Sequence, residues 1–317
     1  MCLYRSRSGV KMSTMVATSS TLSARSTVDI RLVLSLAAVY VIWSSTYLVM
    51  KLAVVELPPF LMAGVRFVAA GLVMLLVAMR RGTPVPPAHA WLRVVPIGAL
   101  LFVGGNGFVS IAQISVTSGG AAVVCAMMPL WVGVLGAITG ERPSNREWLS
   151  LAIGFVGIVV LMGGPSLAGE PLHVVLIICA PICWALGSVM ARRLPPSIGG
   201  DAFMLPAMEM LTGGVALSVV GLSRGERMPL DASASAWIAL GYLFLFGSLV
   251  AFTAYNWLLR NARPTLATSY AYVNPVLAVL LGAAISGEPL GATTLVANGL
   301  IVAAVMLALR RSSSRRP

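Results

Sequence analysis

The stretch FLMAGVRFVAAG, residues 60–71, returns later in the chain as FMLPAMEMLTGG, residues 203–214, at an offset of 143 positions. Both copies are apolar over almost their whole length. Each carries one ionisable residue at the same place, Arg66 in the first copy and Glu209 in the second. Long apolar stretches cross a bilayer as α-helices. The two copies therefore predict a membrane protein built from two related halves.

The repeat extends along the chain with a slowly drifting offset. WSSTYLVMK at residues 43–51 lies over WALGSVMAR at residues 184–192 at an offset of 141. At offsets of 146 and 147, the matched residues are Ala121, Pro129 and Gly136 with Ala267, Pro275 and Gly282, and Gly140-Glu141 with Gly287-Glu288. The drift indicates small insertions and deletions in the loops between otherwise equivalent helices.

Ten apolar segments are long enough, or nearly so, to cross a bilayer. They cover residues 32–50, 59–79, 94–115, 118–138, 148–162, 172–190, 202–222, 236–258, 266–286 and 290–309. Each copy of the repeat holds five of them. Because five is odd, the second copy enters the membrane from the opposite face, as in the inverted repeats of secondary transporters. We expect an all-α integral membrane protein with ten transmembrane helices in two inverted five-helix repeats.

Lys and Arg residues fall almost entirely on alternate sides of these segments. With the N-terminus inside, eighteen lie in cytoplasmic loops and tails, and three (Lys51, Arg224 and Arg227) lie outside. Positively charged loop residues resist translocation, so this asymmetry sets the orientation. We expect both termini in the cytoplasm and a multi-pass protein of the bacterial cytoplasmic, or inner, membrane.

Composition agrees with the membrane interpretation, because 58% hydrophobic and 10% charged residues do not suit a soluble globule. The net charge of +12 would indicate nucleic acid in a soluble chain, but here the excess lies in short loops beside the lipid headgroups. We therefore expect no nucleic-acid partner. The four cysteines, Cys2, Cys125, Cys179 and Cys183, form no disulfide or zinc pattern, so no metal site is expected.

Enzyme functions find little support in the chain. The two histidines, His89 and His173, lie near segment ends, and no HExxH or GxSxG motif occurs. Lys11 and Lys51 follow Val and Met, so the Gly-Lys of an ATP-binding phosphate loop is absent from the sequence. The sequence predicts no catalytic residues and no cofactor. A carrier is favoured over a channel because charges are few and no filter motif repeats.

The chain ends are predicted to be tails. Residues 1–31 are basic and rich in Ser and Thr, which fits a disordered cytoplasmic tail, a true start at Met12 or Met15, or an organellar transit peptide. Residues 310–317 form a short basic tail that we also place in the cytoplasm. Neither stretch is predicted to cross the membrane.

Several short motifs resemble those of one transporter family. They are the WSSTY beginning at Trp43, Arg66-Phe67, Pro129 followed by Gly140-Glu141, and YVNP ending at Pro275 followed by Gly287-Glu288. In this order and spacing they resemble the EamA-type exporters of the drug/metabolite transporter superfamily, over residues 38–162 and 172–309. The resemblance implies a ten-helix basket in which the first four helices of each repeat surround a central cavity and the fifth is peripheral. It also implies metabolite or drug efflux.

Arg66 and Glu209 are the only ionisable residues deep inside apolar segments, where burial costs at least ~2.5 kcal/mol on insertion scales. Each lies roughly 10 Å deep, from opposite faces of the membrane, at 1.5 Å per residue. One interpretation is a structural ion pair. A second is a binding site in which Arg66 holds an anionic group and Glu209 a cationic group or a coupling proton. A third is that Arg66 snorkels to the surface.

Other candidates lie near helix breaks or are interior aromatic residues. Gly104 to Gly107 and the prolines Pro129 and Pro275 predict interruptions that would border a cavity, although close glycine packing is the alternative. The interior aromatic residues are Trp43, Tyr47, Trp184, Tyr255, Tyr270 and Tyr272. Core filling is their alternative role. The full predicted substrate site is Trp43, Tyr47, Arg66, Asn106, Trp184, Glu209, Tyr270 and Asn274.

These observations predict a secondary transporter that exports a small amphipathic metabolite or drug-like solute by alternating access, with proton coupling through Glu209 as one mode. The alternatives are a non-transporting membrane scaffold or sensor and, less favoured, a membrane-embedded enzyme. The expected partners are the solute and the lipid bilayer, and the protein is expected to be a monomer or a homodimer.

Overall fold

The structure is a computed structural model that describes residues 29–112, 114–115, 124–161, 170–199, 202–274, 276–277 and 292–309. Within these ranges, the side chains of residues 47, 48, 51, 161, 294, 295, 308 and 309 are outside the description. Every regular element in the described ranges is a helix. Residues 1–28 of the predicted N-terminal tail, and the whole predicted tail 310–317, lie outside the described residues.

The first repeat contains α1 (Ile30–Ala53), α2 (Pro59–Arg80), α3 (Ala88–Gly98), the π-helix η1 (Ala99–Gly107), α4 (Phe108–Ala112), α6 (Met128–Ile138) and α7 (Asn145–Leu161). The second contains α8 (Pro171–Arg192), α9 (Pro196–Gly199), α10 (Met204–Ser223), α11 (Ala234–Tyr242), the π-helix η2 (Leu243–Val250), α12 (Ala251–Asn261), α13 (Pro264–Ala267) and α15 (Ala292–Leu309). Residues 270–274 are also helical. Both repeats thus use an α-helix that passes through a π-helix.

Local sequence explains several helix boundaries. The Asp29 side chain caps α1 by accepting a hydrogen bond from the Arg31 amide at 2.9 Å, so two residues of the predicted tail are already helical. Gly82 and Gly225 follow α2 and α10 with φ of 83° and 78°, values that favour glycine. These two glycines are themselves repeat equivalents, at the offset of 143.

Helices α2 and α10, equivalent in the repeat, pack closely against each other through small residues. A Cβ atom on Gly64 would lie 3.0 Å from the Gly214 carbonyl oxygen, and a Cβ atom on Gly71 would lie 3.0 Å from the Ala207 carbonyl oxygen. The offset of 143 maps Gly64 onto Ala207 and Gly71 onto Gly214, so it exchanges these two contacts. Contacts that map onto each other indicate a local pseudo-twofold axis between the repeats.

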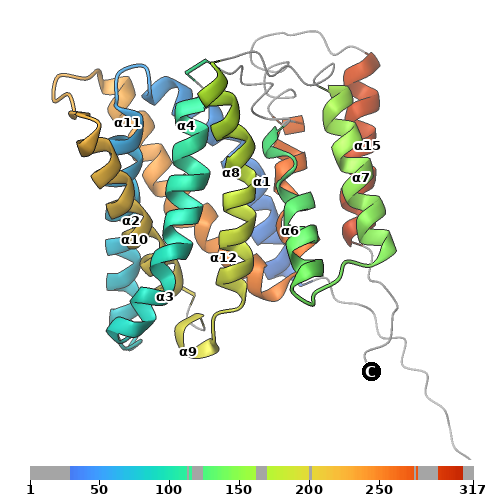
Figure 1. Ribbon diagram of the computed structural model, residues 1–317, viewed down its shortest axis with the longest axis horizontal. Helices are drawn as coiled ribbons and strands as arrows, with labels where there is room; N and C mark the ends of the chain where they lie inside the picture. Colours follow the sequence, from blue (N-terminus) through green and yellow to red (C-terminus); the bar gives the residue numbers. More distant parts are fainter. Residues whose placement is uncertain are drawn as a thin grey trace, which may run out of the picture.

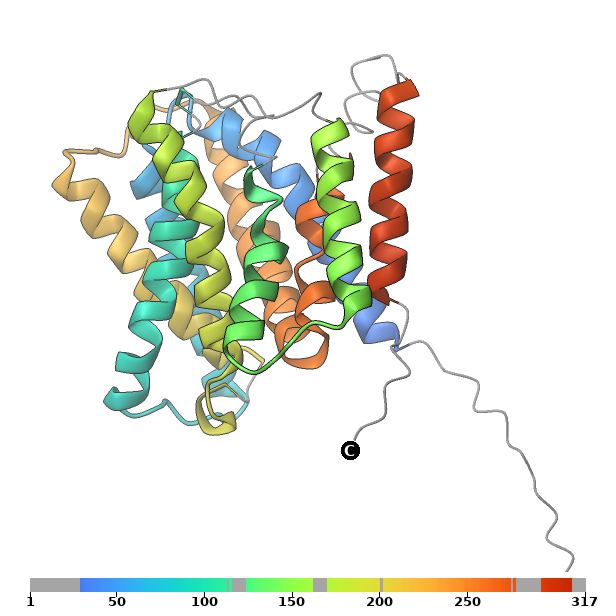
Figure 2. The ribbon, with the colours of Figure 1, turned by 45° about the vertical axis from the view of Figure 1, so that its right-hand side comes forward.

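The helices form one bundle with a separate pair at its edge (Figure 1). Helices α7 and α15 pack chiefly on each other at that edge and stand together in both ribbon views (Figures 1 and 2). In the bundle, α1 packs against α11 and α12, and α8 packs against η1 and α6. Helices α1, α6, α8 and α12 therefore meet around the centre of the bundle.

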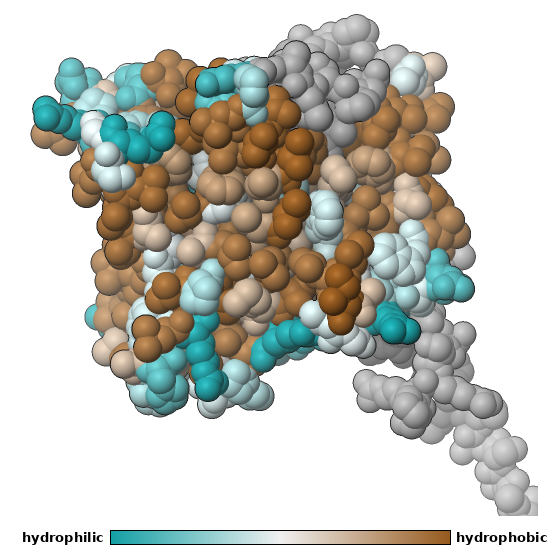
Figure 3. Space-filling view, in the orientation of Figure 1, coloured by the Kyte–Doolittle hydropathy of each residue, from teal (hydrophilic) through white to brown (hydrophobic). Residues whose placement is uncertain are grey.

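Five helical stretches are long and apolar enough to cross a membrane: Pro59–Arg80, Ala88–Ala112, Pro171–Arg192, Met204–Ser223 and Ala234–Asn261. Three shorter apolar stretches are Ile30–Thr46, Met128–Ile138 and Val296–Leu307. An apolar band covers one face of the molecule between more hydrophilic edges (Figure 3). The predicted spans 118–138 and 266–286 lie partly outside the described residues, so the count of ten stays a prediction.

The predicted interruption at Gly104 to Gly107 is wrong. The chain is helical without a break from Ala88 to Ala112, and the glycine stretch forms the end of η1. A π-helix keeps backbone hydrogen bonds inside the helix while widening the turn, which satisfies the polar backbone in an apolar setting. The span also begins six residues before the predicted Val94. The glycines serve packing, as described below for Gly105.

Candidate functional site

Four aromatic side chains meet at the centre of the bundle, and we call them the aromatic cluster: Trp43 of α1, Trp184 of α8, Tyr255 of α12 and Tyr270. The Trp43 ring centroid lies 4.6 Å from that of Tyr270 and 5.1 Å from that of Tyr255. Trp43 and Trp184 meet edge to face at 5.9 Å. Contacts of this geometry stabilise aromatic pairs beyond the burial of their area.

The polar atoms of the cluster have partners inside the protein. Trp43 Nε1 donates to the Gly247 carbonyl oxygen of η2 at 3.2 Å. Trp184 Nε1 donates to the Tyr255 hydroxyl at 3.3 Å, and that hydroxyl shares a 2.7 Å hydrogen bond with Ser188. Buried Trp and Tyr need such partners. The cluster therefore combines apolar ring faces with a short hydrogen-bonded chain that joins α8 to α12.

Gly105 of η1 explains how Trp184 reaches the cluster. A Cβ atom at Gly105 would lie 2.4 Å from Trp184 Cε3, closer than atoms can approach without movement. Its neighbour Gly104 faces Cys183, and a Cβ atom at Gly104 would lie 2.7 Å from the Cys183 Cβ. The glycine pair thus lets α8 approach η1 closely, which is the packing role of small residues in membrane helices.

Glu209 lies on α10 and is fully buried. Its Oε2 accepts a hydrogen bond from Asn256 Nδ2 of α12 at 3.2 Å. Its Oε1 is buried and has no hydrogen-bond partner among the described residues. Arg260, one helical turn beyond Asn256, interacts electrostatically with the carboxylate. A buried carboxyl with one oxygen unbonded is suited to receiving a proton or a cationic group.

Arg66 lies on α2 and is 5% exposed, so protein covers it and the snorkelling interpretation is disfavoured. Its guanidinium carbon lies 4.1 Å from the centroid of the Phe67 ring, a cation–π contact. Its Nε is buried without a hydrogen-bond partner among the described residues. Arg66 therefore retains a donor that an anionic group could take.

Arg66 and Glu209 form no ion pair. The three ion pairs within the described ranges involve other residues. The antiparallel register of α2 and α10 explains the separation. Gly71 lies between Ala207 and Leu211, and so at the level of Glu209. Arg66 is five residues before Gly71 on α2, which is about one and a half turns along the axis. The two charges are therefore offset along the helix axes, and their depths in the membrane stay a prediction.

A row of phenyl rings connects Arg66 to the aromatic cluster. Phe67 lies 4.3 Å from Phe102, Phe102 lies 5.2 Å from Phe252, and Phe252 lies 6.2 Å from Tyr255, measured between ring centroids. Phe102 and Phe252 are both buried. This row fills the interior between the charged residue and the cluster with apolar surface.

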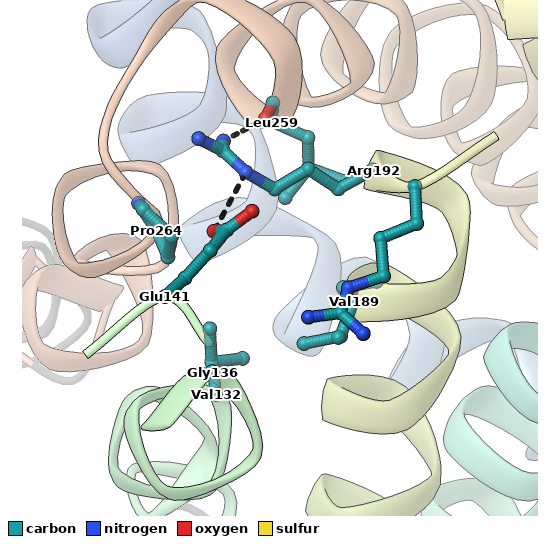
Figure 4. A pocket seen from close by; sticks show the side chains of 9 residues that line it. Val132, Gly136, Glu141, Val189, Arg192, Leu259 and Pro264 are labelled. Carbon is teal, nitrogen blue, oxygen red and sulfur yellow. Dashed lines mark hydrogen bonds and ion pairs between the residues drawn. The ribbon is translucent and has the colours of Figure 1, made fainter. Parts of the chain in front are cut away.

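Arg192, at the end of α8, contacts Glu141, which follows α6, and Leu259 of α12 (Figure 4). Arg192 Nε pairs with Glu141 Oε2 at 3.2 Å, and its Nη1 donates to the carbonyl oxygens of Leu259 and, at 2.9 Å, Ala262. Val132, Gly136 and Pro264 line the small cavity beside this pair. An adjoining cavity of about 220 Å³ shares these three residues. Arg192 thereby links α8 to the segment after α6 and to the end of α12.

A second contact between the repeats joins the loop after α1 to the start of α11. The Glu56 carboxylate, between α1 and α2, accepts hydrogen bonds from the Ser233 amide at 2.7 Å and the Ser233 hydroxyl at 2.5 Å, at the start of α11. These bonds hold the pKa of Glu56 below its ordinary value, because they favour the ionised carboxylate. Because the Glu56 carboxylate is exposed, these two hydrogen bonds contribute little to the stability of the fold, and their main effect is to orient the loop between α1 and α2.

Comparison with known proteins identifies the family. The model described as the EamA-like transporter family matches the chain twice, over residues 30–163 and 171–310. The chain belongs to this family. It is 44% identical over 274 residues to the inner membrane transporter YedA of Escherichia coli strain K12, covering 86% of this chain and 89% of the relative. These matches confirm the family resemblance drawn from the motifs.

More distant matches agree. The chain is 23% identical to the transporter YvbV of Bacillus subtilis strain 168, covering 90% of this chain and 94% of that protein. A solved structure, at 22% identity, superposes with a TM-score of 0.71 over 88% of this chain and 96% of that chain. At this identity the superposition shows the shared fold alone. The protein is thus a multi-pass membrane transporter of the EamA family.

The predicted site residues of this transporter fall into separate groups. Trp43, Trp184 and Tyr270 meet in the aromatic cluster. Asn274 accepts a hydrogen bond from Ser44 at 3.0 Å and is 3% exposed, so it lies beside α1 near the cluster. Asn106, in η1, is partly exposed, and its carbonyl oxygen accepts from Ser110 at 2.8 Å.

The proline predictions have different outcomes. Pro129 occupies the first turn of α6, after a turn at residues 126–127, so a helix begins there. Proline is well tolerated at this position because it has no amide hydrogen to leave unbonded. Pro275 lies outside the described residues, and so does the side chain of Tyr47.

Sequence reasoning did not assign Asn256, Ser188 or Arg192 to the site, and it noted Tyr255 only as an interior aromatic residue. One signal was available, because Tyr255-Asn256 is a polar pair inside an otherwise apolar span. Its partners, Ser188 and Glu209, come from other helices. Only their contacts in the folded transporter reveal the role of the pair.

Proposed function

We propose that this transporter exports a small amphipathic solute from the cytoplasm by alternating access between its two inverted repeats. The observation that carries the proposal is the meeting of Trp43 and Trp184, equivalent residues of the two repeats, at the centre of the bundle. Transporters of this architecture bind substrate near the midplane, at the repeat interface. A site on that interface changes its exposure when one repeat rocks against the other.

The chemistry of the central residues supports an amphipathic substrate. The aromatic cluster offers ring faces to an apolar or aromatic group, with indole and hydroxyl groups at the ring edges. Arg66 and Glu209 offer opposite charges at different depths, one for an anionic group and one for a cationic group or a proton. A zwitterionic or weakly basic solute with an apolar body satisfies both features.

The tie made by Arg192 supports a gate on the cytoplasmic side. Its partners Glu141, Leu259 and Ala262 lie at the ends of helices from both repeats. Breaking this set of contacts would let α6 and α12 separate from α8. In the proposed orientation, with both termini in the cytoplasm, Arg192 faces the compartment from which the solute is loaded.

The experiment is transport by membrane vesicles of inverted orientation. A metabolite-toxicity screen first compares cells that overexpress the parent protein with cells that express Arg66→Ala, and it identifies solutes against which only the parent protects. The labelled solute is then offered to inverted vesicles, where export appears as accumulation. Accumulation above that of Arg66→Ala vesicles at equal protein abundance supports the proposal. No difference for any solute of the screen would favour the scaffold or sensor alternative.

A further inference from the structure

The Glu209 carboxyl makes its hydrogen bond to a single side chain among the described residues. Asn256 Nδ2 donates to Oε2 at 3.2 Å, and Asn256 is itself 2% exposed. The same nitrogen donates to the Phe252 carbonyl oxygen at 3.3 Å, within its own helix. Asn256 is thus held between the carboxyl of α10 and the backbone of α12.

An amide is able to respond to the proton state of its partner. An ionised carboxylate only accepts hydrogen bonds, whereas a protonated carboxyl also has an O–H that must donate. Asn256 carries both a donor, Nδ2, and an acceptor, Oδ1. A proton from bulk water that forms an O–H bond at Oε2 requires the amide to present Oδ1 instead of Nδ2. A proton at Oε1, the unbonded oxygen, leaves Nδ2 donating to Oε2 but removes the negative charge that strengthens this bond. In both cases protonation changes the contact between Glu209 and Asn256. The original arrangement returns when the proton leaves to water.

Helix α12 joins this contact to the aromatic cluster. Tyr255, the neighbour of Asn256, touches the rings of Trp43, Trp184 and Tyr270 and shares a hydrogen bond with Ser188. Directly before α12 lies η2, whose Gly247 carbonyl oxygen holds Trp43. A π-helical segment marks a place where a helix can shift its register, and such segments occur often at functional sites.

Other charged and titratable groups lie on the helices that pack against α10. Arg260 and Tyr255 of α12 interact with the Glu209 carboxyl electrostatically. On α2, Arg66 forms no ion pair with Glu209 within the described ranges, and Arg80 is exposed, as are His89 and Arg93 on α3. Neither η1 nor α9 contains a titratable side chain. Asn256 is the neutral group in direct contact.

We propose that Asn256 is a positioning residue that transmits the protonation state of Glu209 through α12 to the aromatic cluster. The inference rests on the proposed proton role of Glu209 and adds the route by which that proton changes the substrate site. Asn256 itself is not required to touch the solute. Its function is to convert a change at the carboxyl into a movement of Tyr255.

The test uses two signals from the purified full-length protein in lipid nanodiscs, without any solute. Infrared difference spectra across a pH titration report protonation of the Glu209 carboxyl, assigned by its loss in Glu209→Gln. Tryptophan fluorescence over the same titration reports changes around Trp184 in the aromatic cluster. The response of Trp184→Phe is subtracted to remove the contribution of the other tryptophans. The variant is Asn256→Leu, and the control is Asn261→Leu. Asn261 is exposed on the same helix and bonds its own backbone at Trp257.

We expect the parent and Asn261→Leu to show both signals, and Asn256→Leu to keep the carboxyl signal but lose the fluorescence response. Asn256→Gln, which restores an amide, should recover it, and a role in packing alone would not require this recovery. A full fluorescence response in Asn256→Leu would overturn the inference and leave the proton role intact. No carboxyl titration in the parent would overturn both. If Asn256→Leu fails to fold, Asn256→Ala, which also removes both the donor and the acceptor, replaces it in the same comparison.

Discussion

Trp43 of α1 and Trp184 of α8 hold equivalent places in the two repeats, and their rings meet edge to face with centroids 5.9 Å apart. When equivalent residues touch each other, the contact lies on the axis that relates the two copies. The same relation appears between α2 and α10 in the reciprocal contacts of Gly64 and Gly71. The aromatic cluster therefore occupies the interface at which the repeats would move.

The contact between the two tryptophans should be measurable as a coupling energy. In a double-mutant cycle with Trp43→Phe and Trp184→Phe, the effects on the free energy of unfolding should depart from additivity by about 0.5–1.5 kcal/mol. Trp237, which is 37% exposed, serves as the control partner for Trp184 and should give additive effects. Additive effects for Trp43 and Trp184 would mean that their contact carries no energy.

Gly105→Ala should destabilise the transporter, because the new methyl group would lie 2.4 Å from Trp184 Cε3. Overpacking of this kind costs about 1–3 kcal/mol. Gly241→Ala is the matched control, since a Cβ atom there meets nothing within 4 Å, and its helix should gain slightly. The thermal unfolding midpoints of both variants check this prediction. Equal midpoints would show that Trp184 moves aside without cost.

Arg192→Ala should release the contacts of α8 with Glu141 and Leu259 that Figure 4 shows and so increase access to the cavity beside them. The variant loses hydrogen bonds of a charged group, each contributing roughly 1.5 kcal/mol or more, which corresponds to about a tenfold rise in the open population. Val132 lines the cavity, so Val132→Cys is introduced into a variant of the protein without its native cysteines. The rate at which a maleimide labels this cysteine in inverted vesicles then measures how often the cavity is accessible. Arg93 is exposed, so Arg93→Ala is the control. Unchanged labelling in Arg192→Ala would rule out a gate at this position.

The orientation in the membrane is open to a direct test. A reporter fused after Gly225 should behave as periplasmic, and one fused after Pro84 as cytoplasmic. With the N-terminus inside, Pro84 follows the second predicted span and Gly225 follows the seventh, and eighteen of the twenty-one basic loop and tail residues then lie inside. Activities of an alkaline phosphatase fusion and a fluorescent protein fusion at each position distinguish the two sides. If both positions read as cytoplasmic, the inverted arrangement of five plus five helices is wrong.

Glu209→Gln should abolish efflux driven by a proton gradient while downhill exchange of the same solute stays measurable, since the neutral amide resembles the protonated acid. Arg66→Ala should instead weaken binding of the solute found in the screen. Glu170→Gln, with a side chain that is 60% exposed, controls for the loss of a carboxylate. Uphill efflux by Glu209→Gln equal to that of the parent, at equal abundance, would assign Glu209 a structural role.

The sequence by itself determined the family, the apolar segments and the equivalence of the two halves, because hydropathy, loop charge and repeated motifs are properties of consecutive residues. It also predicted different depths for Arg66 and Glu209, since a predicted depth follows from counting along a helix at about 1.5 Å per residue. Counting along a helix does not show which of its faces contacts which neighbouring helix.

The tertiary structure alone decided the contacts across the bundle. Glu209 bonds Asn256 rather than Arg66, and Tyr255 joins Trp43 to Ser188, because side chains from helices distant in the sequence converge there. Gly104 and Gly105 suggested a break in the helix. In the structure they belong to a π-helix that continues the span, and their lack of side chains lets it pack closely against α8. The packed arrangement must satisfy the backbone hydrogen bonds, fit the side chains of neighbouring helices and bury their polar groups at the same time. These requirements depend on several helices at once, so no single segment of sequence determines the outcome.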